Sequence, residues 1–293
     1  MVLKNISPEI SPILAKLFNR CLKEKTFPSS WKMSSVCPVF KNSGERSDPS
    51  KYRPISLLCI VSKLFESVLN RHIMKYLKAH SLLSDIQYGF RSSRSTADIL
   101  TVISHRISEA LDSSFVSRVG ALDISKAFDQ VWHRCILHKL CSYGISGRLY
   151  STVESFLLGR KMRVVINGQK SEVFETNAGV PQGSVLGPTL FLLFINDLPS
   201  SELRSLINIF ADDTTLYGST SKDLSIEGLD DNLTGDLSIT AQWGNRWLVT
   251  FNASKTKLVT FHHHREGPLP PHIIIGKSEL EDCSCLDSCL GSN

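Results

Sequence analysis

The sequence predicts an α+β fold, with helices and mostly antiparallel strands. Several stretches carry apolar residues at the three- and four-residue spacing of an amphipathic helix, and several shorter ones are strand-like and linked by tight turns. The two kinds of segment do not alternate regularly, as they would in a parallel α/β sheet. With 293 residues, of which 42% are hydrophobic, the chain can bury one large core or form two lobes that share a cleft.

The first part of the chain is mainly helical. Residues 7–25 place isoleucine, leucine and phenylalanine at helical spacing, and Pro28 lies just beyond their end. A short strand is predicted over 35–40, and the polar loop after it is closed by residues 52–54. Apolar stripes then predict two more helices, which contain residues 64–77 and 99–111.

Strands become more frequent in the second part. A strand is predicted over 119–124, and Asn167-Gly168 is a tight-turn signal between strands over 162–167 and 172–176. The stretch 218–228 is rich in serine, aspartate and glycine and is predicted to be a linker. Further helices are predicted over 132–143, 146–158, 188–198 and 236–247, and a last strand over 258–261.

Charge, apolar segments and cysteine usage indicate where the protein acts. The formal net charge of +5 and the pI near 8.7 permit a polyanionic partner without requiring one. The longest dense apolar run, 190–195, is far too short to cross a bilayer, and the N-terminus lacks the apolar core of a signal peptide. Five of the eight cysteines are scattered among apolar or helical stretches, as free thiols are. We expect a soluble protein without a membrane partner, intracellular in the nucleus or cytoplasm and not secreted.

Two adjacent carboxylates, Asp212 and Asp213, lie between apolar arms rich in β-branched and aromatic residues. This pattern predicts a hairpin with both charges at its bend. Neighbouring carboxylates repel each other unless a cation neutralises them, so the doublet is either a metal site or an acidic turn. The doublet Asp230-Asp231 lacks strand-like flanks and is predicted to lie on the surface.

Asp123 is the third carboxylate, because it follows another apolar strand in the same way. Three carboxylates from two strand ends, with a backbone carbonyl such as that of Ile124, would suit Mg²⁺, which prefers oxygen ligands and often completes its shell with substrate phosphates. Two such ions about 3.5 to 4 Å apart support an in-line displacement at phosphorus. The set therefore favours nucleotidyl transfer.

The loop 178–188 lies between these carboxylates in the sequence and contains three glycines and two prolines. Glycine lets a backbone approach a ligand closely, and proline fixes turn geometry. Taken alone, the loop could equally be an ordinary connection from a strand to a helix.

The combination resembles the palm of reverse transcriptases. Residues 123–128 match motif A, residues 179–188 match motif B, and residues 210–213 match motif C, in the family order. Blocks typical of the preceding fingers and of motif D also match, at 31–41, 52–56, 87–96 and 247–256. The full set is similar to the enzymes of non-LTR (LINE-type, jockey-like) retrotransposons, over about residues 10–280.

The resemblance implies a role for each matching residue. Asp123, Asp212 and the carbonyl of Ile124 would hold two Mg²⁺ ions, which Mn²⁺ can replace, with Asp213 as a supporting ligand and Lys255 as the acid for the leaving pyrophosphate. Phe128 would exclude a 2′-hydroxyl, although it could also be a core aromatic. The residues implied in nucleotide binding are Lys41, Arg53, Arg91, Gln182 and Gly183. Those implied in contacts with template or primer phosphates are Arg94, Arg160, Lys161 and Arg163.

The resemblance also implies a right-hand polymerase fold. A helical lead-in is expected at 1–20, the fingers at 21–118 and the palm, with an antiparallel sheet packed on helices, at 119–276, so that 21–276 form the reverse transcriptase domain. The thumb is expected to be missing and 277–293 to be a truncated, disordered tail. The expected partners are an RNA template, a DNA primer and dNTPs.

Two other readings are open. The chain could be a catalytically silent retroelement remnant that at most binds nucleic acid, or an enzyme of the group II intron or retron type, which the sequence around motif C favours less. The tail combines a histidine run, 262–264, with three cysteines, but their spacing fits no common zinc site.

Overall fold

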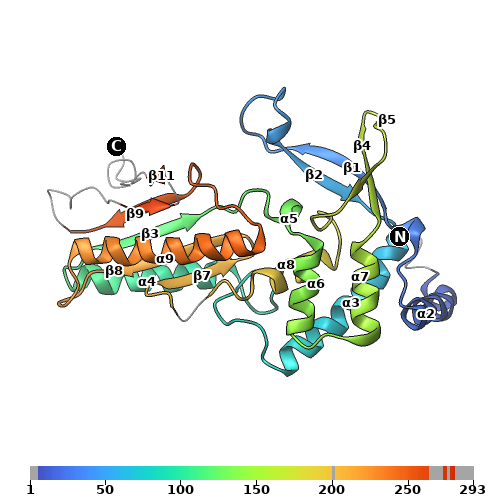
Figure 1. Cartoon of the computed structure of the whole chain (residues 1–293), viewed down its shortest axis with the longest axis horizontal. Coiled ribbons are helices and arrows are strands. Elements are labelled where there is room, and N and C mark those ends of the chain that lie inside the picture. The colour runs from blue at the N-terminus through green and yellow to red at the C-terminus, as the bar shows by residue number, and fades with distance from the viewer. Residues whose placement is uncertain (1–5, 200–201, 264–272, 276–277, 281–293) are drawn as a thin grey trace. The chain divides into compact units, whose positions relative to one another are not determined.

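The computed structural model describes residues 6–199, 202–263, 273–275 and 278–280 (Figure 1). The chain folds into two compact units, and each is built from two separate stretches. The first unit comprises Met1–Leu82 and Val131–Phe194, and the second comprises Leu83–Gln130 and Ile195–Asn293. Each unit contains a sheet with helices, so the predicted α+β fold is confirmed.

The sheet of the first unit has the order β2-β1-β4-β5, and β6 also pairs with β4. Strand β1 is antiparallel to β2 and parallel to β4. Residues 52–54, which were predicted to close the polar loop, begin strand β2, and Pro54 lies opposite Pro38 in the β1–β2 ladder. The strands are β1 (Met33–Phe40), β2 (Tyr52–Leu57), β4 (Arg160–Ile166), β5 (Gln169–Lys170) and β6 (Phe174–Thr176).

The helices of the first unit surround an aromatic core. Phe18, Phe27, Trp31, Phe65 and Phe156 pack with ring centroids 5.0 to 6.4 Å apart. Rings at these separations bury large apolar areas and add a favourable contact energy of about 0.5–1.5 kcal/mol per pair. The helices are α2 (Ser7–Glu24), α3 (Ile60–Ala79), α6 (His133–Ser142), α7 (Gly147–Leu157) and α8 (Gly187–Ile195), with 3₁₀ turns η1 (Ser29–Trp31) and η2 (Pro49–Lys51). These α-helices confirm the corresponding predictions from apolar spacing.

The sheet of the second unit is antiparallel, with the order β7-β8-β3-β9 (Figure 1). Side chains alternate between the faces of a strand. On one face Tyr217 donates a hydrogen bond to the carbonyl of Arg106 in helix α4, and on the other face Arg118 pairs with Asp230 in helix α9. Helices α4 and α9 therefore cover opposite faces. The elements are β3 (Ser117–Leu122), β7 (Leu206–Phe210), β8 (Asp213–Ser219), β9 (Lys257–Phe261), α4 (Thr96–Asp112), α5 (Ala127–Gln130) and α9 (Ile226–Trp247), followed by β10 (Ile274–Ile275) and β11 (Ser278–Glu279).

Helix α9 corrects two predictions. It begins ten residues before the predicted start at 236, so the stretch 218–228 holds the end of β8 and the first turn of α9 within one unit and is not a linker between units. It also carries the doublet that was predicted to lie on the surface. Asp230 is in fact mostly covered and forms an ion pair with the fully buried Arg118, whereas Asp231 is exposed.

None of the described helices is long and apolar enough to cross a membrane. The five described cysteines are free thiols, and two of them, Cys21 and Cys135, are buried. The predicted tail lies mostly outside the described residues, and so do His264 and the three cysteines Cys283, Cys285 and Cys289.

Candidate active site

The predicted hairpin of carboxylates is present. Strands β7 and β8 pair up to Phe210 and Asp213, so Ala211 and Asp212 form the turn between them. Ala211 has a φ of 58°, in the left-handed region that non-glycine residues rarely adopt. A two-residue turn between paired strands fixes the backbone positions of both aspartates, since Asp212 lies in the turn and Asp213 is the first residue of β8.

Strand β3 brings Asp123 to the same place. Leu122, the last residue of β3, lies opposite Thr214 in β8, so the next position along each strand carries Asp123 and Asp213. The backbone of Asp123 is held from the other side, because its carbonyl accepts a hydrogen bond from Asn252 N at 2.8 Å. Asp123 and Asp213 are 90 positions apart in the sequence. They thus lie at adjacent ends of two paired strands.

The carbonyl of Ile124 is not used in the hydrogen bonds that join its segment to the neighbouring one. Ile124 and Phe251 form an isolated antiparallel bridge, whose hydrogen bonds run from Asn252 N to the carbonyl of Asp123 and from Ser125 N to the carbonyl of Thr250. In such a bridge the N–H and C=O of the central residue point away from the partner segment. This geometry leaves the predicted carbonyl ligand of Ile124 accessible to another partner.

The three carboxylates act on one another electrostatically. Burial raises the pKa of Asp212, and the nearby charges of Asp213 and Asp123 raise it further, while a backbone hydrogen bond opposes these effects. Burial and the charge of Asp123 also raise the pKa of Asp213. Bringing negative charges together in a partly desolvated place is unfavourable unless a cation compensates them.

Lys255 is the nearest cation to this group among the described contacts. Its Nζ lies 3.5 Å from Oδ2 of Asp123. That oxygen is buried and accepts no hydrogen bond from any residue that the structure describes. A buried carboxylate oxygen without a hydrogen-bond donor is unusual in a folded protein, and a bound cation would satisfy it.

The donor set fits a divalent cation bound together with a substrate. Among the described residues, no group of three or more His, Cys, Asp or Glu side chains is placed so that it could hold a metal ion. Mg²⁺ does not require one, since it is commonly held by one or two carboxylates with substrate phosphates and water. Asp123, Asp212 and Asp213 would supply the hard oxygen ligands, and a cation would relieve their mutual repulsion.

Phe128 lies in the short helix α5, five residues after Asp123. Its ring packs edge to face against Phe90, with centroids 6.0 Å apart and an interplanar angle of 88°. Phe90 has a φ of 56° and is 47% exposed. The predicted sugar gate is therefore a partly exposed ring supported by a second aromatic from the loop before α4.

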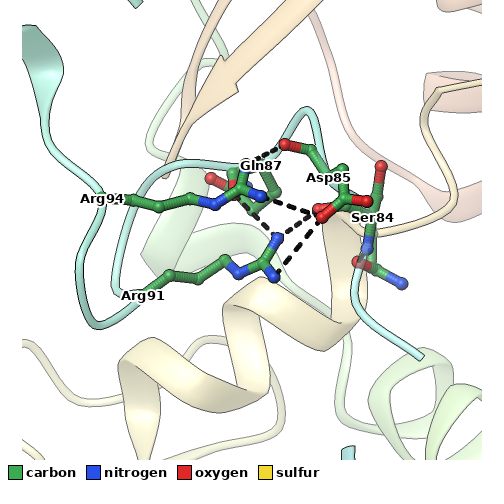
Figure 2. Close-up of polar contacts among 6 residues, drawn as sticks. Ser84, Asp85, Gln87, Arg91 and Arg94 are labelled. Carbon is green, nitrogen blue, oxygen red and sulfur yellow. Dashed lines mark hydrogen bonds and ion pairs between the residues drawn. The ribbon is translucent and has the colours of Figure 1, made fainter. Parts of the chain in front are cut away.

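The predicted cations Arg91 and Arg94 are both engaged within the protein (Figure 2). Arg91 Nη1 donates to the carbonyl of Ser84 at 2.5 Å and to that of Gln87 at 3.3 Å. Arg94 Nη2 lies 2.8 Å from Oδ1 of Asp85, and its Nη1 donates to the Asp85 carbonyl. Burial lowers the pKa of Arg91, and the charge of Arg94 lowers it further. Both guanidinium groups stabilise the loop 84–94, and the phosphate-binding roles implied for them remain predictions.

The glycine-rich loop in the first unit is held at several points. The carbonyl of Gln182 accepts a hydrogen bond from Ser56 N at 2.7 Å, on the edge strand β2. Gly183 has a φ of 119°, and a Cβ there would lie 2.6 Å from the carbonyl oxygen of Ser56. Upstream, the carbonyl of Gly179 lies 2.8 Å from Nε2 of His133. The loop is therefore a defined structure in which glycine is required at position 183.

Glu66 anchors the downstream end of this loop and was missed in the sequence. It is fully buried in α3, and its Oε2 accepts hydrogen bonds from Ser184 Oγ at 2.5 Å, Val185 N at 2.8 Å and Leu186 N at 3.2 Å. Ser62 Oγ donates to Oε1 at 2.8 Å. The available signal was its position on the apolar stripe of α3, where a charged residue requires a partner.

Lys41 and Arg53 lie on one hairpin of the first unit. Val39 pairs with Arg53 in the β1–β2 ladder, and Lys41 N donates to the carbonyl of Lys51 at 2.8 Å, which continues the same register. Positions 39, 41, 51 and 53 thus share a face of the hairpin. Both predicted cations are exposed, and Lys41 Nζ donates to the carbonyl of Ser50 at 2.9 Å.

One predicted phosphate contact is wrong. Arg160 is 3% exposed, its guanidinium lies over the ring of Phe156, and burial lowers its pKa to about 10 while the charge of Glu66 acts in the opposite direction. A side chain buried in this way cannot reach a nucleic-acid backbone. Lys161 is exposed and lies 3.4 Å from Glu175, and Arg163 is half-buried.

Comparison with known families decides the identity. The family model described as reverse transcriptase (RNA-dependent DNA polymerase) matches residues 39–280. The chain belongs to the reverse transcriptase family. This match includes all three carboxylates, the loop 178–188 and the hairpin of Lys41 and Arg53. Reverse transcriptases generally use divalent metal ions.

Relatives from mobile elements share much of this sequence. The RNA-directed DNA polymerase from mobile element jockey of Drosophila melanogaster is 34% identical over 264 residues, which are 88% of this chain and 28% of that protein. The probable RNA-directed DNA polymerase from transposon X-element of the same species is 32% identical over 262 residues, again 88% of this chain and 28% of that protein. The chain spans little more than a quarter of the length of these relatives, and the predicted resemblance to the jockey-like group is confirmed.

Solved structures of similar fold include telomerases. Apo telomerase from Candida tropicalis, truncated from its C-terminal domain, aligns with a TM-score of 0.58 at 14% identity over 80% of this chain and 51% of that chain. Telomerase from Candida albicans in complex with the TWJ fragment of telomeric RNA aligns with a TM-score of 0.54 at 12% identity over 87% of this chain and 46% of that chain. These similarities confirm the predicted polymerase fold.

Proposed function

We propose that this chain catalyses RNA-directed DNA synthesis. The 3′-hydroxyl oxygen of a DNA primer attacks the α-phosphorus of a dNTP, so that one P–O bond forms and the bond to pyrophosphate breaks, while the RNA template selects the base. In-line displacement at phosphorus depends mainly on positioning and charge neutralisation. The proposal extends to where the protein acts, inside the cell in the nucleus or cytoplasm, where RNA and dNTPs are present.

One observation carries the proposal: the end of β3 and the β7–β8 turn bring Asp123, Asp212 and Asp213 together. The raised pKa values of Asp212 and Asp213 show that their environment disfavours uncompensated negative charge. Structural ion pairs lower the pKa of a carboxylate, whereas burial and like charges raise the pKa values of Asp212 and Asp213. Such a group is suited to bind a cation that arrives with a phosphate substrate.

We assign the metal ligands accordingly. Asp123 and Asp212 would bind two Mg²⁺ ions with the carbonyl of Ile124, and Asp213 would support them. Two such ions, when bound, increase the nucleophilicity of the primer hydroxyl and stabilise the leaving oxygen. The protein contributes the fixed positions of its ligands, and Lys255, near Asp123, can donate a proton to the departing pyrophosphate.

The remaining roles concern the nucleotide. Phe128, supported by Phe90, would close the space that a ribose 2′-hydroxyl needs. Gln182 and Gly183 would bind the nucleotide through the anchored loop, and Lys41 and Arg53, on one face of their hairpin, would neutralise the triphosphate. A division into fingers over 21–118 and palm over 119–276 is part of this proposal.

Primer extension tests the proposal. The purified chain is incubated with oligo(dT) on poly(rA), dTTP and Mg²⁺ or Mn²⁺, and Asp212→Asn is compared with Asp231→Asn, which removes an exposed carboxylate from α9. We expect extension by the wild type and by Asp231→Asn, and a loss of at least about 100-fold in Asp212→Asn, as for other removed catalytic electrostatic groups. Extension that survives in Asp212→Asn, or none by folded wild-type protein that still binds the duplex, would contradict the proposal.

A further inference from the structure

The turn that carries Asp212 requires support from outside the hairpin. Ala211 adopts a left-handed φ of 58°, a conformation that is strained for a residue with a Cβ. The β7–β8 pairing ends at Phe210 and Asp213, so the N–H of Ala211 has no partner in that ladder. Ala211 is buried, and a buried N–H must find another acceptor.

Gln87 supplies this acceptor. Its Oε1 accepts a hydrogen bond from Ala211 N at 3.2 Å and another from Gly89 N at 2.7 Å. The side chain is 1% exposed, so water does not compete for these bonds. A single amide oxygen therefore ties the residue before Asp212 to the segment 87–89.

The backbone of the same segment lies against β7. Ile209 N donates to the carbonyl of Ile86 at 2.9 Å, and Tyr88 N donates to the carbonyl of Ile209 at 2.8 Å, which makes a short parallel bridge between Gln87 and Ile209. The approach is close at Gly89, where a Cβ would lie only 2.2 Å from Ala211 N. Only glycine allows the segment to reach the catalytic turn at this distance.

The loop that carries Gln87 is itself fixed. Figure 2 shows the guanidinium groups of Arg91 and Arg94 directed at Ser84, Asp85 and the backbone of Gln87. Ser84 N also donates to Oδ1 of Asn196 at 2.8 Å, which fixes the start of the loop. The two arginines therefore restrain both ends of the segment from which Gln87 reaches Ala211.

We infer that Gln87 is a positioning residue for the catalytic turn: its amide oxygen holds Ala211 in the left-handed conformation that directs Asp212 and Asp213 toward the metal site. The inference rests on the proposed function and adds a residue that contacts neither substrate nor metal. Outer residues that orient metal ligands typically change metal affinity or activity about 10- to 100-fold when they are replaced. Because Gln87 acts on the carboxylates and not on the nucleotide, kcat and metal affinity should fall while the KM for dNTP stays nearly constant.

The test uses the full chain and a substitution of similar size at position 87. Gln87→Met removes the acceptor, and Gln242→Met, at an exposed position in α9, controls for the change from glutamine to methionine. Mn²⁺ affinity is measured by the EPR signal of the free ion, and kcat and KM by primer extension. We expect Gln87→Met to weaken Mn²⁺ binding and to lower kcat by about 10-fold or more, and we expect Gln242→Met to retain both within about 3-fold.

The outcomes separate the two claims. If the wild type binds Mn²⁺ and extends the primer but Gln87→Met does the same, the inference fails and the proposed function stands. If the wild type does neither, the proposed function fails and the inference with it. Should Gln87→Met not fold, Asp85→Ala loosens the arginine contacts from an 89% exposed side chain. We then expect a loss of about 2- to 5-fold in Mn²⁺ affinity, and unchanged affinity would overturn the inference.

Discussion

Replacement of Glu66 should remove the anchor of the glycine-rich loop and leave the rest of the fold in place. In Glu66→Ala, Val185 N loses its acceptor, Leu186 N keeps only Ser184 Oγ at 3.1 Å, and the hydroxyls of Ser62 and Ser184 must turn to other partners. A buried donor without an acceptor costs about 1–3 kcal/mol, and removing the buried side chain leaves a cavity. We expect the free energy of unfolding to fall by about 3 kcal/mol.

Glu66→Gln is the sharper comparison. Its amide oxygen can face Ser184, Val185 and Leu186 while its NH₂ donates to Ser62, so the donors keep an acceptor. The negative charge of Glu66, which opposes the lowering of the Arg160 pKa by burial, is lost. We expect a loss of about 1 kcal/mol, measured by urea denaturation.

A control variant and a measurement of activity accompany the substitutions at position 66. Glu109→Ala, at an exposed position in α4, should change stability by less than about 0.5 kcal/mol. Because the loop holds Gln182, Glu66→Ala should also raise the KM for dNTP in primer extension. Equal stability of Glu66→Ala and Glu66→Gln would refute the role of this carboxylate as an acceptor for the loop.

Three further changes test other parts of the site. Gly183→Ala places a Cβ 2.6 Å from the carbonyl oxygen of Ser56 at a φ of 119°, so we expect a stability loss of about 1–3 kcal/mol by urea denaturation; an unchanged midpoint would contradict the geometry. Phe128→Ala should lower the ratio of kcat/KM for dNTP over rNTP by about 10- to 100-fold, and a ratio equal to that of the wild type would exclude Phe128 as the sugar gate. Without metal, Asp212→Asn should have a Tm equal to or higher than that of the wild type, since burial already disfavours the charge of Asp212. Mn²⁺ should raise the Tm of the wild type by mass action, and Asp212→Asn should lose most of this increase. An undiminished increase in Asp212→Asn would show that the metal binds elsewhere.

The sequence was sufficient to predict the hairpin of Asp212 and Asp213 because its signals are local. The arms of β7 and β8 have strand-forming residues on both sides of Asp212 and Asp213, so the hairpin and its turn follow from neighbouring residues. Asp123 was predicted to join them from the same pattern at the end of β3. The pairing that puts Asp123 beside Asp213 is long-range and was implied by the family resemblance rather than by the residues themselves.

Predictions failed where tertiary contacts override local preference. The first turns of α9 contain glycine, asparagine and adjacent aspartates, which are weak helix formers, yet Leu229 and Leu233 are buried and Asp230 pairs with Arg118. Burial and a charge partner therefore stabilise a helix that propensity alone does not predict.

The positioning residues were hidden for a related reason. Glu66 lies on the apolar stripe of α3, but the stripe does not identify its partners, and Gln87 lies in a short irregular segment with no periodicity. Both residues accept hydrogen bonds from backbone N–H groups that are 119 to 124 positions away in the sequence. Such partners are defined only once the fold brings the segments together.

The most direct measurement is single-nucleotide addition to a DNA primer on four RNA templates that differ only in the next template base. Each reaction contains Mg²⁺ and one of the four dNTPs, with wild type, Asp212→Asn and Asp231→Asn in parallel. We predict that wild type and Asp231→Asn add only the nucleotide complementary to each template base, and that Asp212→Asn adds none at a comparable rate. Addition that ignores the template base, or that continues in Asp212→Asn, would contradict RNA-directed synthesis at this site.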